Sequence, residues 1–378
     1  MRHLPGVHFQ PVLEAPTQNG APAQQGQAVV PFVVGSNLYR EAPFDTFVQA
    51  LDANAHERVL NITPGGFLRG VILQVTSAGG VLGAGVLAAD APWSVFSSIA
   101  LEDISGGPVL YPMTGFAAMI KQKFFQPWEG DPSKRAGFSN TINPSFTLRL
   151  SIELRDTLCV LANTDARAQY RLRYTVAPST QVYSAAPTTP ATLTINASIA
   201  VWAQPDAHDL LGNGIEQIPA GLNASRFIMH ELPTLNAGST VLRHSLMGNE
   251  VRCIGWIVRN SLGARVDLTD ANAGALDFRL DNRRLWKMRP SQIVEEMGWF
   301  YEQLANGSWT RDTGVYIIPR FRDVGNLKGE YWLQTVEQSL LQLELSGSDL
   351  GANAPGTIEI IYDELAVAGA LPPELEGI

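Results

Sequence analysis

The stretch SSIALEDISGGPVLYPM (residues 97–113) predicts a β-hairpin. Apolar and polar residues alternate in it as they do in a half-buried strand, a Ser-Gly-Gly tip interrupts the alternation, and the alternation then resumes. The stretch LDFRLDNRRLWKM (residues 276–288) has the same arrangement around an Asp-Asn tip. The two hairpins lie about half a chain length apart, so they suggest that one structural unit occurs twice.

The segments around the two hairpins also correspond. A strand-like segment precedes each hairpin: RGVILQV (69–75) in the first half and CIGWIVRN (253–260) in the second. A helix-like segment follows each one, namely TGFAAMIKQKFF (114–125), where Thr114 suits an N-cap, and RPSQIVEEMGWFYEQL (289–304). The order of these elements, more than sequence identity, indicates a duplication. Coincidence within an all-β chain is the alternative.

The rest of the chain is also dominated by strand-like patterns. Period-2 alternation recurs between turn residues at 145–156, 169–178, 191–204, 239–246, 251–260, 314–320, 340–347 and 356–365. Such a density of strands favours antiparallel sandwiches. A sandwich of about eight strands with a helix inserted after a hairpin fits a jelly roll. The predicted fold class is therefore all-β, with two tandem eight-stranded antiparallel jelly rolls, each with a short inserted helix.

Composition suggests where the boundaries between these units lie. Residues 1–30 predict a flexible N-terminal arm, because most of this stretch is rich in Pro, Gln, Ala and Gly. Residues 31–180 then form the first jelly roll. A Pro/Ser/Thr-rich bridge places a linker at residues 181–190. Residues 191–378 are expected to form the second jelly roll.

A short helix is expected over residues 43–51. Phe44, Phe47, Val48 and Leu51 fall at i, i+3, i+4 and i+7, which is one face of a helix. That face either docks on the core or lies exposed as an adhesive surface. We include its four apolar residues among the candidate subunit-interface residues.

Aromatic residues gather at the end of each inserted helix. They lie in FFQPWEG (124–130) and WFYEQ (299–303). Protein interfaces are enriched in such rings, although these could equally cap the core of each sandwich. The further candidate interface residues are Phe124, Phe125, Trp128, Trp299, Phe300 and Tyr301.

The charge and composition of the chain limit the function classes. The net charge is −9 and no run of Lys or Arg appears, so we expect no direct binding of nucleic acid. Hydrophobic residues make up 45% and charged residues 17%, which suggests either that neighbouring subunits cover much of the surface or that alanine inflates the apolar fraction. Cys159 and Cys253 lie in apolar segments and predict two buried thiols. The chain shows neither a membrane span nor a secretory signal.

No pattern of catalytic or cofactor-binding residues is found. The histidines are scattered without zinc spacing, at His3, His8, His56, His208, His230 and His244. Glu102 and Asp103 are adjacent on a strand and point to opposite faces, so they cannot converge on a substrate. The loop DLTDANAGALD (267–277) lacks EF-hand spacing, so the sequence gives no support for a calcium site there. We therefore predict no catalytic, metal or cofactor site, and no enzyme.

Three stretches resemble the double jelly-roll major capsid proteins of tailless, membrane-containing (tectivirus-like) DNA phages. They are residues 30–48, residues 91–116 with the helix after them, and residues 276–288 with theirs. The resemblance covers most of the chain beyond residue 30. It implies trimeric capsomers, an icosahedral shell, a lipid membrane beneath it, and N-terminal segments that face the membrane or clasp neighbours. The first 30 residues here are not amphipathic in the way that membrane contact would require.

The leading interpretation is a major capsid protein that forms homotrimers, which tile an icosahedral virion shell as pseudo-hexagonal capsomers. Its expected partners are itself, minor capsid or vertex proteins and an internal lipid membrane. Its expected location is the virion of a bacteriophage, assembled in the host bacterial cytoplasm. The alternative is a phage spike or receptor-binding β-sandwich that recognises carbohydrate. A polysaccharide-degrading enzyme is a third possibility, but it lacks a convergent pair of carboxylates.

Overall fold

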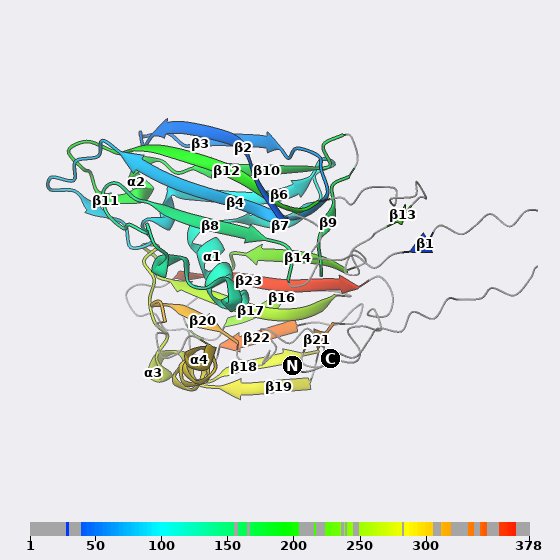
Figure 1. Ribbon diagram of the computed structural model, residues 1–378. Helices are drawn as coiled ribbons and strands as arrows, with labels where there is room; N and C mark the ends of the chain where they lie inside the picture. Colours follow the sequence, from blue (N-terminus) through cyan, green and yellow to red (C-terminus); the bar gives the residue numbers. More distant parts are fainter. Residues whose placement is uncertain are drawn as a thin grey trace, which may run out of the picture.

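Strands account for most of the secondary structure in this computed structural model, as the alternating patterns predict (Figure 1). The structure describes residues 39–154, 158–164, 167–203, 224–235, 240–244, 249–281, 283–304, 311–318, 332–335, 341–345 and 355–367, with the short pieces 28–29, 215–216 and 238. The predicted N-terminal arm, residues 1–30, lies outside the described residues except for positions 28 and 29. None of the described helices is both long and apolar enough to cross a membrane.

The first sandwich packs two sheets against each other. One sheet runs in the order β2-β12-β4-β8, with strands Tyr39–Ala50, Thr192–Trp202, Phe67–Ala78 and Phe146–Ser151. The other runs in the order β7-β6-β10-β3, with strands Pro108–Met113, Phe96–Asp103, Tyr170–Val176 and His56–Asn61. Alternate side chains such as Leu73, Leu148, Ile195 and Leu172 are buried and fill the space between the sheets.

The second sandwich is built in the same way. One sheet runs β14-β23-β17-β20, with strands Ala224–Glu231, Gly356–Val367, Glu250–Arg259 and Val315–Ile317. The other runs β16-β22-β18-β19, with strands Thr240–His244, Leu341–Leu345, Leu276–Leu280 and Arg283–Met288. Its core includes the buried side chains of Trp256, Phe278, Leu343 and Ile360.

The two sandwiches share one strand connectivity. If the eight main strands of each half are numbered in chain order, one sheet of each half has the order 1-8-3-6 and the other the order 2-7-4-5. An inserted helix lies between the fifth and sixth strands of both halves: α1 (Gly115–Ile120), continued by η2 (Lys121–Phe125), and α4 (Pro290–Leu304). The predicted fold class, two tandem jelly rolls with inserted helices, is thereby confirmed.

Shorter helices and strands lie between and beside the sixteen main strands. They are β1 (Ala28–Val29), β5 (Val86–Leu87), η1 (Trp93–Val95), η3 (Pro127–Glu129), η4 (Pro132–Lys134), β9 (Leu161–Ala162), α2 (Ser179–Val182), β11 (Tyr183–Ala185), β13 (Ile215–Glu216), β15 (Thr234–Leu235), α3 (Asp270–Ala273) and β21 (Leu333–Gln334). Strand β1 pairs in parallel with β13.

The helix predicted over residues 43–51 is wrong, because this segment forms most of strand β2. β2 pairs along its whole length with β12, where Phe47 lies opposite Ile195. Pro43 is accommodated at a register shift near Ser198, on an edge strand, which is where a sheet tolerates proline. The helical spacing of the apolar residues was coincidental, since long-range strand pairing overrides a local pattern.

The strand at residues 192–202 does not open the second roll. β12 pairs with β2 on one side and with β4 on the other, so it completes the first sandwich as its eighth strand. The expected linker at 181–190 contains β11, which pairs with β5 of the first half. Because the eighth strand of this roll lies between its first and third, the first sandwich extends to Trp202.

The two sandwiches also meet through their sheets. β7 of the first half and β14 of the second are joined in parallel at Leu110 and Ile228, so one sheet continues from one half into the other. Figure 1 shows the first sandwich in the upper part of the molecule, the second in the lower part, and α1 between them.

Candidate functional site

Aromatic rings from the first inserted helix fill the junction between the sandwiches. Phe124 and Phe125 are fully buried at the end of η2. The Phe124 ring meets the Tyr301 ring of α4 edge-on, with centroids 5.0 Å apart, and the Tyr301 hydroxyl donates to the Phe124 carbonyl at 3.1 Å. The Phe125 ring lies over Gly255 of β17, which has no side chain to obstruct it. The inserted helix of the first half therefore docks on the second half.

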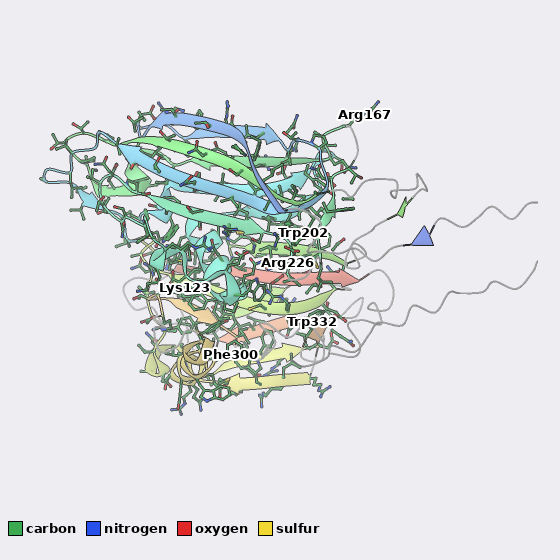
Figure 2. All side chains as sticks on the ribbon, viewed as in Figure 1. Lys123, Arg167, Trp202, Arg226, Phe300 and Trp332 are labelled. Atoms are coloured by element: carbon green, nitrogen blue, oxygen red, sulfur yellow. The ribbon has the colours of Figure 1, made fainter. Side chains whose placement is uncertain are left out.

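A buried ion cluster lies at the same junction. Arg226 of β14 donates to both carboxylate oxygens of Asp363 on β23, at 2.7 and 2.8 Å, and Arg252 of β17 also donates to Asp363. Arg226 reaches the first half as well, where it donates to the carbonyls of Ser151 and Ile152 at 3.2 Å. Figure 2 shows Arg226 where the upper and lower sandwiches meet. Burial alone would raise the pKa of Asp363, but Arg226 and Arg252 outweigh it and hold this pKa below its ordinary value.

Two lysines of η2 take part in the junction. Lys121 is fully enclosed and donates to the Ser151 carbonyl. Burial, and then the charge of Arg226, lower its pKa well below the ordinary value. Lys123 (Figure 2) lies 3.2 Å from Asp131 of the first half and 2.8 Å from Asp312 of the second. Both lysines therefore fix the helix in place, and the enclosure of Lys121 keeps its amine away from any substrate.

A second polar network crosses the junction at Glu359 of β23. Its carboxylate accepts from Thr114, the N-cap of α1, at 3.0 Å and lies 2.9 Å from His230 Nε2. Arg259 lies 3.3 Å from Glu359 and 2.6 Å from Asp90 of the first half. Burial would raise the pKa of Glu359, but its bonds to His230 and the charges of His230 and Arg259 lower it. Charge pairs and hydrogen bonds thus join the two halves on both sides of the aromatic contact.

The structure divides the ten candidate interface residues into three groups. Buried inside the chain are Leu51, Phe124, Phe125 and Tyr301. Half-buried against the core are Phe44, Phe47 and Phe300. Exposed are Val48 (60%), Trp128 (42%) and Trp299 (55%). The buried residues already pack within one chain, which corrects their assignment to a surface that a second subunit could reach. The capping interpretation describes them better.

A cavity of about 460 Å³ opens on the outer face of the sheet β2-β12-β4-β8. Trp128, Arg69 and Arg149 are among its lining residues. The Arg69 guanidinium stacks over the Trp202 ring at 4.2 Å, and the Trp202 indole donates to Glu153 at 2.8 Å. The sequence does not reveal this site, because its members include residues from β4, β8, β12 and η3, which are far apart in the chain. The interior glycine of the RGVILQV strand is the one local signal.

The other polar residues considered from the sequence have structural roles. Asp267 accepts from Arg311 and Gly314, Asp270 from Ser291, and Asp277 from Arg279 and Arg284. These carboxylates bind different partners, so the loop does not present them together to calcium. In the part of the chain that the structure describes, no cluster of His, Cys, Asp and Glu is placed to hold a metal ion. Cys159 and Cys253 are buried free thiols, and burial raises the pKa of each to about 12.

No protein-family model and no curated protein matches this sequence. Solved structures do match. The Sulfolobus turreted icosahedral virus (STIV) structure gives a TM-score of 0.60 at 14% identity, over 89% of this chain and 94% of that one.

Two further solved structures are similar. The crystal structure of the STIV major capsid protein gives 0.58 at 13% identity, over 90% of this chain and 100% of that one. The capsid of the virus PBCV-1 gives 0.51 at 10% identity, over 88% and 97%. This chain therefore has the double jelly-roll fold of viral major capsid proteins.

Proposed function

We propose that this protein is the major capsid protein of a virus, and that it forms homotrimers which tile an icosahedral shell as pseudo-hexagonal capsomers. The observation that carries the proposal is the identical strand connectivity of the two sandwiches. Three copies of a chain that contains the same roll twice present six similar corners. Cyclic symmetry relates the three copies by a threefold axis, and the duplication makes the two sandwiches within each copy similar to each other.

The junction within the chain supports this proposal. Buried aromatic rings, charge pairs such as Lys123–Asp312 and Arg259–Asp90, and a continuous sheet join the two sandwiches. Such a junction makes the pair a single building block, which a lattice of repeated contacts requires. We assign residues 39–202 to the first sandwich and 224–367 to the second, on the basis of their strand pairing.

The finer parts of the proposal concern partners and location. We infer a bacteriophage virion, assembled in the host bacterial cytoplasm, with minor capsid or vertex proteins and an internal lipid membrane as further partners. The net charge of −9 favours contact with the genome through such partners and not directly. Val48, Trp128 and Trp299 are the candidate interface residues that remain exposed.

The test has two stages. Sedimentation-equilibrium analysis of the purified chain should give three times the monomer mass of 41.0 kDa. Electron microscopy of infected or co-expressing cells should then show the chain as the most abundant component of uniform particles. A chain that stays monomeric at high concentration and never enters such particles would contradict the proposal.

A further inference from the structure

The two halves are alike, but among the described residues an inserted helix covers the outer face of only one 1-8-3-6 sheet, that of the second half. On the second half, Phe125 of η2 lies over Gly255, in the third strand. A Cβ at Gly255 would be only 3.1 Å from the ring. Gly255 pairs with Ile317 of the sixth strand and Ile361 of the eighth. The glycine therefore marks the position where the first inserted helix is received.

The equivalent position in the first half is Gly70. It also lies in the third strand, and it pairs with Ser151 of the sixth strand and Ala200 of the eighth. The cavity of about 460 Å³ opens here, with Gly70, Ser151 and Ala200 in its wall. Where the second half receives a phenylalanine ring, the first half presents a cavity, with Trp128 among its lining residues.

The helix equivalent to α1 and η2 is α4, which also follows a fifth strand. Gln292, Glu295 and Trp299 fall at i, i+3 and i+7 on α4 and are all exposed, Trp299 by 55%. α4 therefore presents one large ring on its solvent-facing side.

The charges of the two surfaces are complementary. α4 carries Glu295 and Glu296 and has no Lys or Arg. Three arginines and two glutamates line the cavity: Arg69, Arg135, Arg149, Glu129 and Glu153. An acidic helix and a cavity of net positive charge attract each other.

We propose that Trp299 of one copy inserts into the cavity beside Gly70 of the next copy, and so repeats between subunits the contact that Phe125 makes with Gly255 within the chain. In Figure 1, α4 lies at the lower end of the molecule, and β4, β8 and β12 lie in the upper sandwich. A second copy must therefore provide the ring. Such a contact is head-to-tail, and it closes into a ring of three when each step rotates by one third of a turn. The inference rests on the proposed self-association and names its surface.

Cross-linking tests the contact directly. Ser151→Cys, at a half-buried position in the cavity wall, and Trp299→Cys would be purified separately, mixed, and treated with a short bis-maleimide. The native thiols are buried and their pKa values are raised to about 12, so they react slowly. We expect cross-linked dimers in the mixture and covalent trimers from the double variant. Leu262→Cys, at a position that is 84% exposed on a loop, replaces Trp299→Cys as the control and should give none with Ser151→Cys.

Removal of the Trp299 ring tests how much it contributes to the free energy of trimer formation. Trp299→Ala should weaken trimer formation by roughly 30-fold, whereas Leu262→Ala should leave it unchanged and Trp299→Phe should retain part of it. Thermal melts by circular dichroism would check that each variant is folded. Trimers that form normally in Trp299→Ala, or that give no 151–299 cross-link, would overturn this inference and leave the capsid proposal intact. A wild-type chain that remains monomeric would overturn both.

Discussion

At the scale of single residues, the positions that decide this structure lie at the junction and not in the cores. Gly255 admits the Phe125 ring, and Asp363 holds two arginines that would otherwise be buried charges without a counter-ion. Glycine and aspartate are both uncommon in strands, but the sequence alone does not show what either residue contacts. Their importance comes from what the other half of the chain places against them.

The first prediction concerns Gly255→Val. A Cβ there would lie 3.0 Å from Ile317 Cδ1 and 3.1 Å from Phe125 Cζ, and valine adds two more methyl groups. Overpacking of this kind should lower the free energy of unfolding by about 1–3 kcal/mol, measured by urea denaturation. Ala78→Val, at an exposed position of β4, is the control and should change little. An unchanged urea midpoint for Gly255→Val would show that Phe125 is not held there.

The second prediction concerns Asp363→Asn. Loss of the carboxylate leaves Arg226 and Arg252 buried without their counter-ion, so the free energy of unfolding at pH 7 should fall by about 3–5 kcal/mol. The pKa of Asp363 is lower in the folded protein than in the unfolded chain, where it is about 3.9. The ionised carboxylate therefore stabilises the folded state fully above about pH 3.9, and this contribution is lost as the pH falls towards the lower folded pKa. Urea titrations from pH 7 to pH 3 should therefore show the difference between variant and wild type shrinking below about pH 4.

The matched control for Asp363→Asn is Asp52→Asn. The pKa of Asp52 is also lowered, by the backbone of Asn54 and the side chain of His56, but 44% of its side chain is exposed. Solvent screens such a charge, so the control should cost far less stability. Equal losses in the two variants would contradict the importance assigned to the buried cluster.

At the scale of elements, the start of α1 connects local and long-range structure. Thr114 caps the helix by accepting from the Ala117 amide at 3.1 Å, and it donates to Glu359 of the second half at 3.0 Å. A residue that the sequence marks as an ordinary N-cap is thus also a link between the sandwiches.

The third prediction is that Thr114→Ala lowers the free energy of unfolding by about 1–3 kcal/mol, because it removes a cap and one donor to a buried carboxylate. Thr114→Ser keeps the hydroxyl and should restore most of the loss. Thr269→Ala removes the cap of the short helix α3, on the surface, and should have a smaller effect. Urea midpoints of the three variants measure the differences. A serine variant as unstable as the alanine variant would mean that the methyl group, and not the hydroxyl, matters.

Elements whose sequence signals lie within a few neighbouring residues could be predicted, and elements determined by distant residues could not. The hairpins at 97–113 and 276–288 and both inserted helices form as predicted, because alternation, turn residues and caps act within a few positions. Strand β2 was missed because Phe44, Phe47 and Leu51 imitate a helical face, whereas pairing with residues 192–202 determines their structure. The cavity at Gly70 and the ion cluster at Asp363 were missed because their members are far apart in the chain.

At the scale of the whole molecule, the last strand of the first sandwich lies near the middle of the sequence, beyond the expected linker. The first sandwich is closed by β12, which comes after the segment that composition marks as a linker. Among the described strands, β12 is the one that pairs with both β2 and β4. A boundary drawn from proline and serine content therefore removes the eighth strand from the roll that needs it.

The last prediction follows from that closure. A fragment of residues 31–203 should give a cooperative urea transition, whereas residues 31–190 should not, because removal of β12 leaves β2 and β4 without their common neighbour and exposes the core around Leu73 and Leu148. Near-ultraviolet circular dichroism and limited proteolysis would compare the two fragments. The protein concentration should be low micromolar, because the longer fragment exposes Phe124 and Phe125 and will associate at higher concentration. If the two fragments unfold alike, the strand pairing that defines the first sandwich here does not govern its stability.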